Sequence, residues 1–252
     1  MPVRGRLARG GLYAGAFLGP FGGGITVAML PELGAAYGVT AATAAASVTA
    51  YLLPFAALML VSGTLGERWG RRRTVVTAYL GYAVAALGSV VAPTFEAFLA
   101  SRALQGVANA FTTPLLLAAL AAAAEPGRLG RALGWFGSLQ AAGQTSAPLI
   151  GGLAAELDWR QAFVGVAVVA AVLAAVGIPG GAPGGASRPP LRAALRSALR
   201  PDVLGIGLAA ALGWGLLAGA NFLVALRLED AFDTPAAGRG LVLTGLGVVG
   251  LL

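Results

Sequence analysis

Long apolar stretches separated by short charged turns dominate the chain. Runs without any charged residue extend roughly over 11–30, 44–65 and 74–93. A helix rises about 1.5 Å per residue, so a run of about 20 residues crosses a hydrocarbon core of about 30 Å. The pattern therefore predicts membrane-crossing helices with the charges at the turns between them.

The same criterion predicts eight crossings, of which the last is incomplete. The expected spans are about 11–30, 44–65, 74–91, 97–123, 132–155, 162–178 and 203–225, with an eighth that begins near 240. Between them, 34–43 and 227–239 are expected to be loops. We thus expect an all-α integral membrane protein, and because the chain stops about half a span after residue 240, we expect it to be truncated.

Three regions follow from this layout. Residues 1–178 are predicted to form a six-helix transmembrane bundle, 179–201 a linker on the inner surface, and 202–252 the incomplete start of a second bundle. Within the linker, leucines at 191, 195 and 199 alternate with arginines at 192, 196 and 200. This spacing predicts an amphipathic helix that lies on the membrane surface and contacts its lipids.

Composition agrees with a membrane protein. The 252 residues are 58% hydrophobic and only 11% charged, with a mean hydropathy of +0.81, whereas soluble domains have about 25% charged residues. The net charge of +7 reflects topology, since most arginines fall in segments predicted to be cytoplasmic: Arg4, Arg6, Arg9, Arg68, Arg71, Arg72, Arg73, Arg128, Arg131, Arg188, Arg192, Arg196 and Arg200. Short basic loops stay inside. We therefore expect a multi-pass protein of the plasma (inner) membrane with its N-terminus inside, and no nucleic-acid partner.

The chain contains neither histidine nor cysteine. Their absence removes the commonest general base, the thiolate nucleophile and the usual metal ligands. The glycines at 245, 247 and 250 have the spacing of a dinucleotide-binding loop, but no strand or downstream acid surrounds them. We expect no enzymatic activity, no metal and no cofactor.

The most informative motif is the charged turn between the second and third spans. It contains Gly63, Leu65, Glu67, Arg68, Gly70, Arg71, Arg72 and Arg73. This pattern resembles the signature between helices 2 and 3 of the major facilitator superfamily, in which aspartate is more usual than glutamate at the acidic position. The family consists of secondary transporters, and the resemblance implies that Glu67, with Arg68 and Arg71, closes the cytoplasmic side as a gate.

A polar stripe marks the fourth span. Arg102, Gln105, Asn109 and Thr113 are spaced three, four and four residues apart, which places them on one helical face. Such a stripe should face a cavity or another helix rather than lipid. The run Leu99-x-x-Arg102-x-x-Gln105-Gly106 resembles the family's helix 4 motif, which implies a role for Arg102 in proton coupling. The alternative is that Arg102 reaches the nearby headgroups.

The fifth span carries a third motif. Gly134, Gly143, Pro148, Gly151 and Gly152 resemble the helix 5 motif of the family's antiporter branches, with Ala147 where glycine is usual. Small residues at this spacing favour close helix packing around a kink. The Trp159-Arg160 pair before the sixth span also resembles the family, and Trp159 suits an anchor at the membrane interface.

The resemblance implies a fold of two three-helix inverted repeats in the first six helices, with substrate bound near the midplane against a second half that is missing here. The substrate cavity candidates are Phe17, Gln105, Asn109, Thr113, Gln140, Gln144 and Asn221. The function implied is proton-coupled export of small molecules, of the multidrug type, by alternating access. Two alternatives stay open: an importer of sugars or other metabolites, and a non-transporting scaffold or remnant.

One expectation runs against proton coupling. All ten carboxylates are predicted to lie at helix ends or in loops. The first span in particular lacks the acid that many proton-driven relatives have there, and it is expected to end at Pro31-Glu32 on the outside. The sequence therefore predicts no proton carrier embedded in the membrane.

Overall fold

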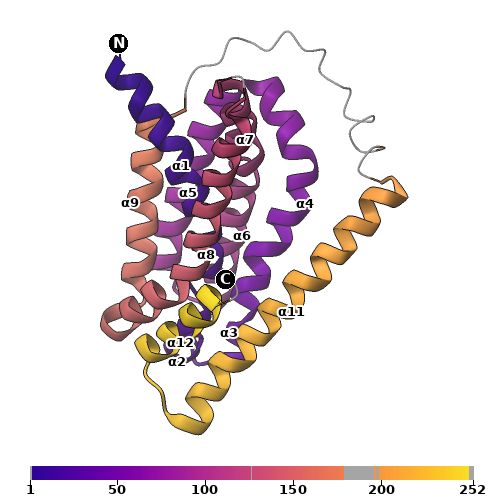
Figure 1. The fold of residues 1–252 in the computed structure, drawn as a ribbon. Helices are drawn as coiled ribbons and strands as arrows, with labels where there is room; N and C mark the ends of the chain where they lie inside the picture. Colours follow the sequence, from indigo (N-terminus) through magenta and orange to yellow (C-terminus); the bar gives the residue numbers. More distant parts are fainter. Residues whose placement is uncertain (1, 126, 179–195, 197–198, 250–252) are drawn as a thin grey trace.

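The computed structural model describes residues 2–125, 127–178, 196 and 199–249, and every regular element in these ranges is a helix. In chain order the helices are α1 (Pro2–Gly24), the 3-10 turn η1 (Val27–Met29), α2 (Leu30–Tyr37), α3 (Ala41–Ala44), α4 (Ala46–Trp69), α5 (Arg71–Val91), α6 (Phe95–Ala110), α7 (Thr113–Ala123), α8 (Leu129–Asp158), α9 (Arg160–Val176), α11 (Pro201–Phe232) and α12 (Ala236–Val249). Figure 1 shows them as a bundle of long helices with α11 beside it.

The bundle has the properties of a transmembrane domain. Four spans are long and apolar enough to cross a membrane: Leu7–Tyr37, Ala41–Trp69, Arg71–Val91 and Phe95–Ala123. The closest packing pairs α8 with α12, α4 with α6, α1 with α8 and α5 with α9. Together these features confirm the all-α membrane fold predicted from the sequence.

The two ends of the bundle differ in charge. Arg9, the α4–α5 turn and the 125–131 turn lie at one end, which we call the basic end. The opposite end, which we call the far end, contains α2, α3 and the turns that precede α6, α9 and α12. Successive spans run between these ends in alternating directions, as a chain that threads a membrane must.

The first span differs from the prediction. Its helix breaks between Gly24 and Val27 and resumes as α2, which reaches Tyr37. The expected end at Pro31-Glu32 was therefore wrong. Proline is acceptable in the first turn of a helix because the amide it lacks has no helical partner there. Glu32 consequently lies in the first turn of α2 instead of at the end of the span.

The fourth span is also broken, where a single helix over 97–123 was predicted. It consists of α6 and α7, separated at Phe111 and Thr112. Pro114 stands in the first turn of α7, where its missing amide proton again suits a helix start. The Thr112 hydroxyl donates to the backbone oxygen of Asn109 at 2.9 Å and so satisfies a carbonyl at the interrupted end.

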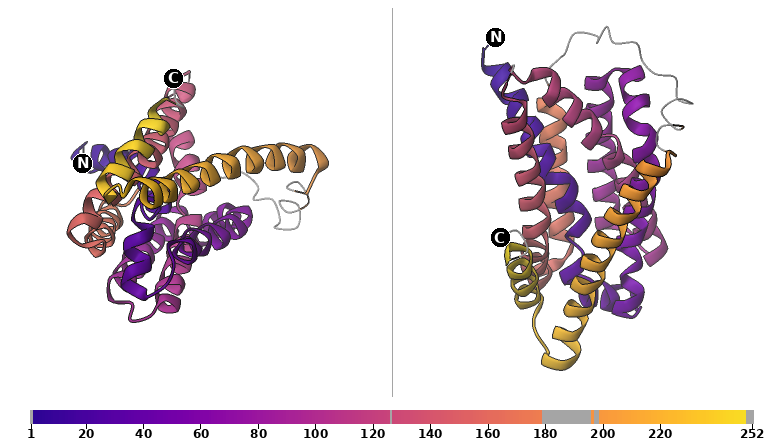
Figure 2. Two further views of the ribbon diagram at one scale, coloured as in Figure 1. Left: turned by 90° about the horizontal axis from the view of Figure 1, so that it is seen from below. Right: turned by 45° about the vertical axis from the view of Figure 1, so that its right-hand side comes forward.

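The last two helices extend further than predicted. The loop expected at 227–239 is much shorter, since α11 continues to Phe232 and α12 begins at Ala236. Figures 1 and 2 show α11 leaning away from the bundle at its start and meeting it near its end, where it contacts α12 and η1. The amphipathic helix predicted for the linker lies largely outside the described residues.

Candidate functional site

The charged turn at the basic end ties three helices together. Gly70 separates α4 from α5 and has a φ of +94°, a backbone conformation that residues other than glycine rarely adopt. Across it, the Arg71 Nε donates to Glu67 Oε1 at 2.6 Å, and the Arg71 Nη1 donates to the Ala118 oxygen of α7 at 3.2 Å. The pair is partly shielded, with 24% and 34% of the two side chains exposed. Arg68 is exposed and has no ion pair among the described residues.

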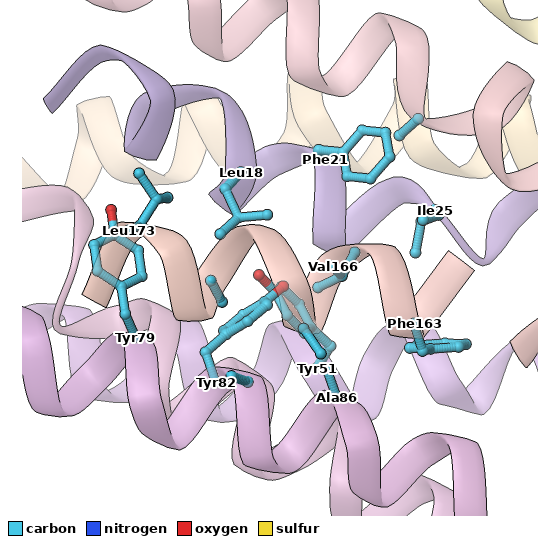
Figure 3. Close-up of a cluster of buried hydrophobic side chains, with 14 of the residues drawn as sticks. Leu18, Phe21, Ile25, Tyr51, Tyr79, Tyr82, Ala86, Phe163, Val166 and Leu173 are labelled. Atoms are coloured by element: carbon cyan, nitrogen blue, oxygen red, sulfur yellow. The ribbon is translucent and has the colours of Figure 1, made fainter. Parts of the chain in front are cut away.

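Arg102 lies at the centre of the bundle, fully buried. Its Nη1 donates to the Gly22 oxygen of α1 at 3.1 Å and to Gln105 Oε1 at 2.9 Å. Its guanidinium carbon lies 4.6 Å from the ring centre of Tyr51, within cation–π range. Figure 3 shows Tyr51 in the same buried layer as Phe163, whose ring centre is 5.6 Å from that carbon.

The charge of Arg102 is therefore stabilised by carbonyl and amide oxygens and by aromatic rings. No carboxylate pairs with it in the part of the chain that the structure describes. Its Nε and Nη2 have no hydrogen-bond partner there. Of the two sequence alternatives, the geometry excludes a side chain that reaches out to the headgroups.

The rest of the polar stripe is engaged with neighbouring helices. The Gln105 Nε2 donates to the Ser89 hydroxyl of α5 at 2.8 Å, and Ser89 in turn lies 2.6 Å from the Ser101 hydroxyl. Asn109 accepts from the Thr112 hydroxyl at 2.8 Å and packs against Gly19 of α1. The stripe thus joins α6 to α1 and α5.

The cavity candidates fall into two groups. Gln105 and Asn109 are buried, with at most 5% of either exposed. The others are at least partly exposed: Phe17, Thr113, Gln140, Gln144 and Asn221. Phe17 stacks on Phe21 with ring centres 5.4 Å apart, and its backbone lies against Gly143, between the two glutamines of α8.

Three glycines of the helix 5 motif lie where a neighbouring backbone comes too close for a side chain to fit. A Cβ atom at Gly143 would lie under 3.0 Å from the Phe17 oxygen of α1, and one at Gly151 as close to the Ile25 oxygen just after α1. One at Gly152 would lie as close to the Ala236 oxygen of α12. Gly134, by contrast, has no atom within 4 Å of that position. The motif therefore packs α8 on two helices at once, and Gly134 takes no part.

The contact between α8 and α12 is the most extensive in the molecule. Gly240 meets the Pro148 backbone, again under 3.0 Å from an added Cβ. The Thr244 hydroxyl donates to the Thr145 oxygen at 2.8 Å, and the Ala237 amide donates to Glu156 at 3.1 Å. These contacts hold the eighth span against the bundle at the far end.

A buried ion pair reinforces this contact. The Arg239 Nη2 donates to Glu32, its Nε to the Ala28 oxygen at 3.1 Å, and its Nη1 to the Thr234 oxygen at 2.8 Å. Only 3% of the Arg239 side chain is exposed, against 29% for Glu32. A pair this shielded is costly to break from one side, because the remaining charge stays desolvated.

The sequence indicated neither the Glu32–Arg239 pair nor the place of Trp159. The sequence predicts that Arg239 lies in a loop. It also places Glu32 at the end of the first span and Arg239 just before the eighth, on the same predicted side of the membrane, and this arrangement could have indicated an ion pair. Trp159, expected at the membrane interface, is buried, with its ring centre 5.6 Å from that of Phe98.

Comparison with known proteins supplies the family. The family model described as "Major Facilitator Superfamily" matches residues 12–252. A protein of Bacillus subtilis (strain 168), described as the uncharacterized MFS-type transporter YybF, is 38% identical over 132 residues, which are 52% of this chain and 32% of that protein. The puromycin resistance protein pur8 of Streptomyces alboniger is 38% identical over 125 residues, 49% of this chain and 25% of that protein. The chain thus matches only a quarter to a third of the length of these relatives.

Solved structures agree on the fold. The crystal structure of the human organic anion transporter MFSD10 superimposes with a TM-score of 0.66 at 18% identity, covering 96% of this chain and 70% of that one. At this identity the likeness concerns the fold alone.

Proposed function

Because the chain belongs to the major facilitator superfamily, we propose that it acts as a secondary active transporter that exports small amphiphilic molecules in exchange for protons. Export is supported above all by α8, whose motif resembles that of the antiporter branches and whose glycines meet the backbones of α1 and α12. The likeness to a puromycin resistance protein points the same way. The described residues contain no cluster suited to metal binding, and the function proposed needs none.

In the proposed orientation the protein lies in the plasma membrane, with its basic end and N-terminus on the cytoplasmic side, as the arginine distribution favours. Substrate would bind near the midplane, against Phe17, Thr113, Gln140, Gln144 and Asn221. Alternating access then requires the far end to open. Opening means separating α12 from α8, and with it breaking the Glu32–Arg239 pair.

Two groups are proposed for proton coupling. Arg102 is a permanent buried cation between α1 and α6. Glu32 lies in the first turn of α2, and its protonation would remove its attraction to Arg239. Glu229, near the end of α11, lies close enough to interact electrostatically with both members of this pair, so a proton from the far side meets a second carboxylate there. Protonation of Glu32 would thus favour opening toward the side from which protons enter.

The test of coupling is Arg102→Gln in the full-length protein, assayed in proteoliposomes with ethidium and puromycin as substrates. We expect proton-driven export to fall at least about tenfold, equivalent to about 1.4 kcal/mol. Substrate exchange without a gradient should persist, because exchange moves no net proton. Loss of both activities would show that Arg102 only holds the bundle together, and retention of both would exclude it from coupling.

The basic end gives a second prediction. Glu67→Gln removes the carboxylate that binds Arg71, so we expect the export rate to fall several-fold. A single cysteine introduced behind the α4–α5 turn should also react faster with a thiol reagent. The direct cost in stability should be small, about 1 kcal/mol or less, since the pair is partly exposed. Asp202→Asn is the matched control, because its pair with Arg200 is more exposed on both sides. Equal behaviour of the two variants would contradict a gating role.

Two other functions make different predictions. An importer would accumulate substrate inside cells without proton counterflow, and the same proteoliposome assay would detect it. A non-transporting scaffold would tolerate Arg102→Gln and alanine at Gln140 and Gln144, while remaining sensitive at the glycines of α8. The exporter proposal fails if substrate accumulation in intact cells is unchanged when the protein is expressed.

A further inference from the structure

A pocket lined by none of the proposed cavity residues lies at the basic end, where α1, α7 and the start of α8 meet. It encloses about 210 Å³, below the 300–1,000 Å³ that is usual for drug-sized ligands. Its size therefore suits the headgroup of a larger molecule rather than a whole substrate of the exported kind.

The rim of the pocket is basic. Arg9 of α1, Arg128 just before α8 and Arg131 in its first turn line the pocket, with Glu125 as the one carboxylate among its lining residues. Glu125 pairs with Arg128 at 3.2 Å, so the lining retains two positive charges. Arg9 and Arg131 have no ion pair among the described residues. Two guanidiniums converge here from segments far apart in the chain, and guanidinium groups match the geometry of phosphate oxygens.

The inner wall of the pocket is apolar. Leu12 and Leu120 form it, with at most 5% of either exposed. Tyr13, Trp135 and three alanines also line the pocket, and 62% of Trp135 is exposed. Tryptophan is enriched at the headgroup level of membranes. A charged rim above an apolar wall thus fits an amphiphile whose acidic head meets the arginines and whose chains continue into the bilayer.

We propose that this pocket binds the phosphate headgroup of an anionic phospholipid from the cytoplasmic leaflet. The chemistry required is that of a phosphodiester with acyl chains, because basic pockets between transmembrane helices favour such lipids. Binding at this point links α1 to the α7–α8 turn and is independent of the direction of transport. The inference rests on the proposed orientation but not on export, so it stands even if export fails.

Quenching of Trp135 fluorescence tests the proposal directly. Full-length protein in an uncharged detergent is titrated with brominated phosphatidylglycerol and, separately, with brominated phosphatidylcholine, and the signal of Trp135→Phe is subtracted. We expect saturable quenching by phosphatidylglycerol at concentrations at least about tenfold below those needed for phosphatidylcholine. Equal quenching by the two lipids would overturn the proposal.

Two variants and one competitor complete the test. An arginine near an anionic surface contributes about fivefold to binding, so Arg9→Gln with Arg131→Gln should weaken phosphatidylglycerol binding about twenty-five-fold. Arg73→Gln, exposed at the same end, should not weaken it. A thermal-unfolding midpoint equal to that of the parent protein checks that the double variant is folded. An unchanged affinity in that variant would overturn the proposal. Displacement of the lipid by millimolar inorganic phosphate would also do so, since the site would then be one for soluble phosphate.

Discussion

The Gly151→Val variant is expected to lose most of its folded yield. A Cβ at this position would lie under 3.0 Å from the Ile25 oxygen and press on Met29, and valine adds two further carbons. Because the obstacle is backbone, it cannot move aside as a flexible side chain would. Overpacking of this kind costs about 1–3 kcal/mol, and more where the backbone must shift. The measurement is the fraction of monodisperse protein that survives solubilisation and stepwise heating.

The same helix provides the matched control for this prediction. Gly134 belongs to the same motif, but an added Cβ meets nothing within 4 Å, and Gly134→Val carries the same change in helix propensity. It should therefore solubilise and melt like the parent protein. If the two variants behave alike, the close approach of α8 to α1 does not govern folding, and the motif acts in some other way.

The second large effect is expected from Arg239→Ala, which should leave the far end open for much of the time. The change removes the partner of Glu32 and the donors to Ala28 and Thr234. Because 29% of Glu32 stays exposed, the loss should cost less than for a fully buried pair, on the order of 2 kcal/mol. If the far end exchanges between a closed and an open state, this loss raises the open-to-closed ratio by more than tenfold.

A single cysteine reports this opening. The chain has no cysteine, and Thr145 lies under α12, with its oxygen bonded to Thr244. Thr145→Cys should thus be slow to react with an impermeant maleimide added on the far side, and at least tenfold faster in the presence of Arg239→Ala. Arg227→Ala, an exposed arginine at the same end, should have no effect. Exchanging the charges, with Glu32→Arg and Arg239→Glu, should restore slow labelling; continued fast labelling would disprove the gate.

Several features could be predicted from the sequence because they depend on local order. Apolar runs between charged turns predict long helices, and the spacing of Arg102, Gln105 and Asn109 places them on one face. The family, predicted from three separated motifs, is confirmed. The close packing of α8 followed from the spacing of Gly143, Gly151 and Gly152 around Pro148.

Other features depend on partners that are distant in the chain. Arg102 is stabilised by the Gly22 oxygen and the Tyr51 ring instead of a carboxylate. The spacing of residues along α6 does not predict these partners. The first span is predicted to end at Pro31-Glu32, whereas in the structure Pro31 stands in the first turn of α2. Arg239 becomes buried only because α12 turns back onto α8. Pairwise contacts of this kind have no periodic signal in a single sequence.

The breaks in the first and fourth spans correspond to each other if the six-helix bundle is a duplicated three-helix unit. The first span breaks between Gly24 and Val27, and the fourth at Phe111 and Thr112; each break comes just past the middle of its span. The first span starts at the basic end and the fourth at the far end, so the breaks occupy equivalent points of the two inverted repeats. An ancestral three-helix unit with one flexible joint, copied upside down, would leave its descendant with a pair of joints facing opposite sides of the membrane. We expect such a molecule to bend toward either side by the same movement.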